Sequence, residues 1–257
     1  MKHGAALLAA LLFCACAGNA RTASAPAAQI ARNNSSWISM PGPGSLVIFG
    51  VSGRQSLRET EINNAIADAA RKVAMFYGVR AVHSHTQRIG PGRLDFFTES
   101  NTVLEYEQEL EKIKDRLIFD PQRDVIHIDG AVFVRFVYPA VFPGNLNFFP
   151  ARGRDGRPAW IDNRPNMIGG FYAGVGFAAR QTRLRDTITM SYESAIVSIV
   201  SRISTNVTAR ETSAGPQNVS FIHRRSEGTL KHFLILETWI DPQNLQVWTL
   251  VVAKNAD

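Results

Sequence analysis

A set of short sequence matches, spaced by about half of the chain, is the feature that most constrains the fold. Each match pairs a segment of the first half with one of the second half, and the matches keep their order along the chain. They are Ser36-Trp37-Ile38 with Ala159-Trp160-Ile161, Phe49-Gly50-Val51 with Ala173-Gly174-Val175, Leu57-Arg58-Glu59-Thr60 with Leu184-Arg185-Asp186-Thr187, and Asp120-Pro121-Gln122 with Asp241-Pro242-Gln243. We therefore predict an internal duplication. The alternative is one continuous domain with coincidental matches.

The two copies share an opening strand and a helix. Short apolar runs over 46–51 and 170–175, bounded by glycine, predict strands. Apolar residues at helical spacing predict helices over 62–76 and 188–203, and Gly78 is expected to end the first of them.

Both copies are expected to close with antiparallel strands. Residues 79–87 alternate as in a strand, and residues 124–138 predict two strands joined at Asp129-Gly130, a strong hairpin signal. Residues 230–240 and 245–254 form the matching pair. The sequence therefore predicts an α+β fold of tandem two-layer units, each a helix packed on a small antiparallel sheet.

A change in composition between the two predicted units marks their boundaries. They cover residues 37–139 and 160–257, and a connector over 140–159 is rich in Pro and Gly. Apolar residues spaced 3-4-3-4 over 103–117 predict an extra helix in the first unit.

The N-terminus has the features of an export signal. Lys2 is followed by an unbroken apolar run and then by small residues, which predicts a signal peptide over 1–15. Cys16, after Ala15, resembles the cysteine of a bacterial lipobox, and residues 16–36 are expected to form a lipidated tether. The alternative is an ordinary cut after Ala20.

Lipidation would anchor the protein firmly in a membrane. Diacylglycerol and an N-acyl chain such as palmitate at Cys16 would bury many methylene groups, each worth about 0.8 kcal/mol. The lipobox resemblance, with Ala17 next, implies an outer-membrane lipoprotein that faces the periplasm or the surface.

Charge and cysteine content exclude several classes of protein. The net charge is +6, yet residues 37–139 hold 12 basic and 13 acidic side chains, so no folded segment is expected to bind nucleic acid. The two cysteines both lie in the first twenty residues, which excludes a disulfide framework and a cysteine nucleophile in the body of the chain.

Five residues are candidates for ligand binding. Arg152, Arg154 and Arg157 cluster in the connector and could bind phosphate or sugar acids, although a solvated basic loop is the simpler interpretation. Trp37 and Trp160 precede the two units; we expect them to pin each unit onto its sheet, and stacking on sugar rings is the alternative.

No catalytic residue, metal or cofactor is predicted. His83 and His85 share one face of a strand, but a third ligand could come only through the fold, so a solvated strand face is the preferred interpretation. The segment Gly50-Val51-Ser52-Gly53 lacks the last glycine of a nucleophile elbow, since Arg54 stands there.

These features together carry a resemblance. Trp-Ile, a strand ending in Gly-Val, an Ala-rich helix, a strand and a closing hairpin behind a lipobox resemble the small outer-membrane lipoproteins typified by the twenty-kilodalton surface antigen lipoprotein of gastric bacteria. The layout is also similar to the N-terminal domain of a periplasmic flagellar assembly protein. The resemblance covers about residues 37–139 and, more weakly, 160–254. It implies an interaction role and no catalytic residues.

The function expected from the sequence is a non-enzymatic envelope lipoprotein. It would act as a structural or protein-interaction module, with an envelope or flagellar protein as partner. The first alternative is a binding protein for an anionic envelope polymer, peptidoglycan or lipopolysaccharide. The second is a periplasmic hydrolase whose site is not visible in the sequence.

Overall fold

A computed structural model describes residues 37–39, 41–90, 93–106, 108–146, 148–153, 156–214 and 217–256. For the strand segments 87–90, 93–100, 205–214 and 217–223, the description is of the backbone alone. The predicted signal peptide, with Cys16, lies outside the described residues.

The chain has an α+β fold, as predicted, with helices packed on antiparallel sheets. The elements in chain order are β1 (Leu46–Gly53), α2 (Arg58–Tyr77), β2 (Val79–Gly90), β3 (Arg93–Glu105), α3 (Leu110–Lys114), β4 (Val125–Ile128), β5 (Ala131–Tyr138), the 3-10 turn η2 (Ala159–Ile161), β6 (Met167–Ile168), β7 (Phe171–Ala178), α4 (Leu184–Ile203), β8 (Thr205–Ala214), β9 (Gln217–Ile240) and β10 (Val247–Asn255). A small sheet has the order β1-β5-β4. A large one has the order β3-β2-β9-β10-β7-β6, and β8 pairs with β9.

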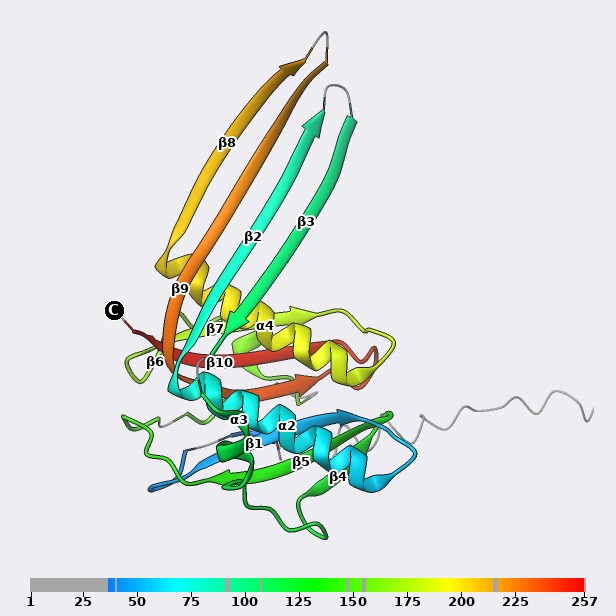
Figure 1. Cartoon of the computed structure of the whole chain (residues 1–257), viewed down its shortest axis with the longest axis vertical. Coiled ribbons are helices and arrows are strands. Elements are labelled where there is room, and N and C mark those ends of the chain that lie inside the picture. Colours follow the sequence, from blue (N-terminus) through cyan, green and yellow to red (C-terminus); the bar gives the residue numbers. More distant parts are fainter. Residues whose placement is uncertain are drawn as a thin grey trace, which may run out of the picture.

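Each half of the chain follows the same path. A strand leads into a 20-residue helix, the helix into a long hairpin, and a later strand returns to pair with the first one. The returning strands are β5, which pairs with β1, and β10, which pairs with β7. Helix α2 packs on β1 and β5, and α4 packs on β7 and β10 (Figure 1).

Glycines let both helices approach their strands closely. A Cβ built on Gly50 would lie 2.0 Å from the Ala65 carbonyl oxygen of α2, and one on Gly176 would lie 1.9 Å from the Ser191 carbonyl oxygen of α4. Only a residue without a side chain fits this spacing. Gly50 and Gly176 are therefore equivalent by contact, although the sequence match had paired Gly50 with Gly174.

Another of the sequence matches joins positions that are not equivalent. Asp241-Pro242 lies in the turn between β9 and β10, whereas Asp120-Pro121 precedes β4. In the first half, the turn that corresponds to Asp241-Pro242 is Asp129-Gly130, between β4 and β5. The hairpin predicted there is confirmed, and both residues have the positive φ of a type I′ turn.

The helix predicted over residues 103–117 is wrong in extent. Val103 lies in β3, where it pairs with Val82 of β2, and the helix α3 has five residues. Strand pairing has overridden the helical spacing here. The apolar side chains of the pattern still reach the core, since Ile113 is buried and Leu110 and Leu117 pack on the same cluster.

The two halves share one hydrophobic core. One buried cluster contains Ala69 of α2, Phe136 of β5, Phe171 of β7 and Leu250 of β10. A backbone hydrogen bond of 2.9 Å from the Ser39 amide to the Leu236 carbonyl also joins the start of the first half to β9 of the large sheet. The halves are thus packed as one body.

The long hairpins of the two halves pair with each other, which two self-contained units would not do. β2 of the first half pairs antiparallel with β9 of the second half, from Val79↔Leu230 to Ile89↔Ser220. The hairpins β2–β3 and β8–β9 therefore form a four-stranded part of the large sheet, which we call the arm. Figure 1 shows this part of the sheet projecting well beyond the helices.

Strand β9 is continuous from the arm into the body, and it is irregular where it enters. Its 24 residues include His232, which has a positive φ of 54°, and the pairing with β10 shifts register between Val252 and Lys254. Such bulges bend a strand sharply while keeping it in its sheet. Among the described residues, no helix is long and apolar enough to cross a membrane.

Candidate interaction surface

The arm has two open edges. Its strand order is β3-β2-β9-β8, and each pairing in it is antiparallel. Within the described residues β3 pairs with β2 alone and β8 with β9 alone, so the outer N–H and C=O groups of both strands have no strand beside them. An exposed strand edge is a template for pairing with another chain.

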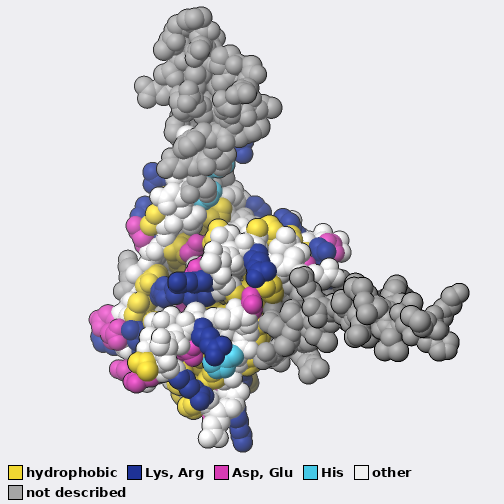
Figure 2. Space-filling model, turned by 90° about the vertical axis from the view of Figure 1, so that its right-hand side faces the viewer, with side chains coloured by type: hydrophobic (Ala, Val, Ile, Leu, Met, Phe, Trp, Pro, Cys, Tyr) yellow, Lys and Arg dark blue, Asp and Glu magenta, His cyan; other side chains and the backbone are white. Residues whose placement is uncertain are grey.

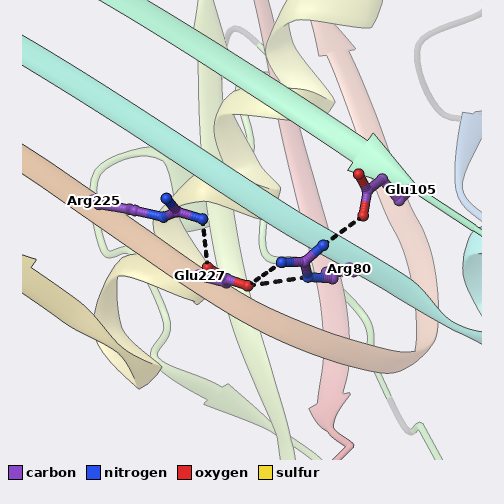
Figure 3. A network of polar contacts seen from close by, with 4 residues as sticks. All are labelled: Arg80, Glu105, Arg225 and Glu227. Atoms are coloured by element: carbon purple, nitrogen blue, oxygen red, sulfur yellow. Dashed lines mark hydrogen bonds and ion pairs between the residues drawn. The ribbon is translucent and has the colours of Figure 1, made fainter.

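A chain of ion pairs holds the base of the arm together (Figure 3). Arg80 of β2 donates to Glu105 of β3 at 2.8 Å and, through Nε, to Glu227 of β9 at 3.0 Å. Arg225 donates to the other oxygen of Glu227 at 2.9 Å. The network spans three neighbouring strands, and cross-strand charge pairs of this kind favour one register over its alternatives.

The charges in this network reinforce one another. Hydrogen bonds from Arg80 and Arg225 lower the pKa of the Glu227 carboxyl, and hydrogen bonds to Glu227 and Glu105 raise the pKa of the Arg80 guanidinium. Because the groups are exposed, water and salt screen them, so their role is to specify register more than to add stability.

Two of the predicted site residues meet at one buried carboxylate. Glu237 of β9 has a fully buried side chain; Trp160 donates its indole N–H to one oxygen at 2.7 Å, and Arg152 forms an ion pair with the other. Burial raises the pKa of the Glu237 carboxyl, against the opposing effect of these two partners. The connector is therefore fastened to the large sheet at this point.

Both predicted tryptophans are buried, which corrects their candidate role in ligand binding. Trp37 is 3% exposed and stacks on Phe133 with ring centroids 4.0 Å apart, and Trp160 is 5% exposed. A ring enclosed by protein has no open face for stacking on a sugar, and the burial of both rings is consistent with the pinning interpretation.

The connector arginines that the structure describes have internal partners. Arg152 also donates to the Gly156 carbonyl at 3.2 Å, and Arg157 pairs with Asp162 at 2.8 Å. Arg154 lies outside the described residues. Figure 2 shows Lys and Arg side chains scattered over one face of the body with acidic side chains among them, so this face has no large field of one sign.

The histidine pair of β2 has no third ligand in the described part of the chain. The described residues contain no group of three His, Cys, Asp or Glu side chains placed to hold a metal ion. His83 Nδ1 lies 3.0 Å from the Thr102 hydroxyl oxygen, and burial lowers the pKa of His83.

A buried ion pair lies beside an apolar pocket between the two halves. The Asp68 carboxylate accepts hydrogen bonds from Lys72 at 2.7 Å and from the Val51 amide at 2.8 Å, and Lys72 also donates to the Phe49 carbonyl at 2.7 Å. Lys72, Trp37 and Phe49 are among the residues that line the pocket. The polar groups of Lys72 and Asp68 are used to join α2 to β1, which is a structural task.

The part of the hairpin β8–β9 that lies in the arm was not predicted from the sequence. Residues 205–214 and 217–229 are rich in Thr, Ser and Asn, and their apolar alternation is too weak to reveal a strand. One signal was present: the dipeptide Gly90-Pro91 recurs as Gly215-Pro216. Gly-Pro is typical of a turn.

Comparison with known proteins adds no assignment. No family model, no curated protein and no solved structure matches the chain. The resemblance to small outer-membrane lipoproteins stays a prediction from the sequence.

Proposed function

We propose that the chain is a non-enzymatic lipoprotein of the bacterial cell envelope that acts as a structural and protein-interaction module through its arm. The observation that carries the proposal is the four-stranded sheet that projects from the body with open edges at β3 and β8 (Figure 1). A sheet edge binds other chains by adding a strand, with main-chain hydrogen bonds supplying the affinity.

The arrangement of the polar groups in the body supports this proposal. Asp68, Lys72 and Glu237 are among the buried charged residues, and each of them holds elements of the fold together. The alternative of an anionic envelope polymer as ligand has less support, because Arg152 and Arg157 are paired with carboxylates of the chain itself.

The proposal is tested by photo-crosslinking in cells. We expect a photoreactive amino acid at position 98 on β3, or at position 207 on β8, to give crosslinks to protein. The same amino acid at position 57, which is exposed at the start of α2 but away from the arm, is the matched control and should give few. An arm without crosslinks, in cells where position 57 does crosslink, would refute the proposed role of the arm.

The anchor part of the proposal depends on Cys16. We expect the mature protein to begin at Cys16 and to carry the mass of a triacyl modification, and we expect Cys16→Ala to remove both the modification and the membrane association. Whole-protein mass spectrometry of envelope fractions measures the two forms side by side. A wild-type chain that begins at Arg21 with no added mass would show a secreted protein without an anchor.

A further inference from the structure

We propose that the partner of the arm is a second copy of this chain, with the β8 edge of one copy paired antiparallel with the β3 edge of the next. The inference rests on the proposed function, since it names the partner of the same arm. It is argued from the direction, the level and the length of the two edge strands.

The direction of the edge strands permits this contact. Every pairing in β3-β2-β9-β8 is antiparallel, so an even number of strands leaves β3 and β8 running in opposite directions. Two copies whose arms point the same way can therefore place β8 beside β3, and the alternation of strand directions continues across the contact. A head-to-tail contact of this kind repeats from copy to copy into a ring or a filament.

The two edges also lie at the same level of the arm. Ser100 pairs with His85, His85 with Arg224, and Arg224 with Val207, so Ser100 and Val207 stand at the two ends of one row. Thr98 and Ala209 end another row, through Gln87 and Ile222. The edges are of similar length, with 13 residues in β3 and 10 in β8.

A two-fold contact fits less well. Antiparallel pairing of β3 with β3, or of β8 with β8, turns the second arm to point the opposite way. Copies anchored through Cys16 in one membrane would share one orientation, and this favours the head-to-tail contact.

The experiment is disulfide crosslinking of the full-length chain in cells. In the double variant Ser100→Cys/Val207→Cys, we expect mild oxidation to give a ladder of dimers, trimers and larger species that reducing agent collapses. Directly opposed Cα atoms of antiparallel strands lie about 4.5–5.5 Å apart, which suits a disulfide. Within one chain the two edges are three strand spacings apart, roughly 14 Å, so an internal disulfide cannot form. Thr98→Cys/Ala209→Cys, and combinations of the two rows, cover a staggered contact.

The controls separate this inference from the proposed function. The parent chain shows any crosslink that forms through Cys14 or Cys16. The control variant Ser100→Cys/His127→Cys has one thiol in the arm and the other at an exposed position of β4, and it should give no ladder. Dimers in the single variants Ser100→Cys or Val207→Cys would show a two-fold contact and overturn the head-to-tail arrangement. Photo-crosslinks from positions 98 and 207 to other proteins, with no ladder in any double variant, would overturn self-pairing and leave the proposed function standing. Failure of both experiments would reject both proposals.

Discussion

Replacing Gly50 with alanine should destabilise the protein by about 3 kcal/mol or more, at or above the top of the usual range for an overpacked core. The new Cβ would lie 2.0 Å from the Ala65 carbonyl oxygen and 2.9 Å from the Phe136 ring. The first of these atoms belongs to the helix backbone, so relief requires a shift of α2 as a whole. Chemical denaturation of the purified Gly50→Ala variant measures the effect.

Gly53 provides the matched control in the same strand. A Cβ at Gly53 would meet no atom within 4 Å. We expect Gly53→Ala to change the free energy of unfolding by less than about 1 kcal/mol, since it acts mainly on the unfolded chain. Equal stability of the two variants would show that α2 does not approach β1 as closely as described.

Replacing Asp68 with alanine should have an effect of similar size, about 3–5 kcal/mol, because it breaks a buried ion pair on one side only. The ammonium of Lys72, with a side chain 6% exposed, would keep its contact with the Phe49 carbonyl but lose its counter-charge. The Val51 amide would also lose its acceptor. The measurement is again the free energy of unfolding of the purified variant.

The double variant Asp68→Ala/Lys72→Met tests the cause. If the stranded charge is responsible, removing it as well should recover part of the loss, so the double variant should be more stable than the sum of the single effects predicts. Coupling between contacting residues is commonly 0.5–3 kcal/mol. Strict additivity would show that the two side chains act independently.

Most of the secondary structure of the body could be predicted from the sequence, for local reasons. The helix of each half has apolar residues at helical spacing. Asp129-Gly130 marks the turn between β4 and β5, because few other pairs of residues favour a type I′ turn. The helix expected to begin near Val103 was wrong in extent. The apolar spacing there is compatible with a helix and with a strand, and only the pairing with Val82 favours the strand. Val82 lies beside Val103 in the sheet but in another segment of the sequence, so the residues around Val103 carry no signal of the pairing.

The arm could not be predicted, because it depends on contacts between the two halves. The sequence predicts a strand over residues 79–87, but nothing in these residues indicates that the strand pairs with β9 of the other half. For the same reason, the sequence placed Arg152 and Trp160 among ligand-binding residues. Their partner Glu237 lies 85 and 77 positions further along the chain.

The continuity of β9 has a mechanical consequence. A single strand of 24 residues, about 80 Å of extended backbone, runs from the far end of the arm to the centre of the body. Within the body it is hydrogen-bonded along its length to β10. A pull on the arm would therefore be carried as shear along these hydrogen bonds, which must break together, whereas a peeling load would break them one at a time. The arm is built as a lever fixed in the body, suited to transmit a load from whatever holds its edges.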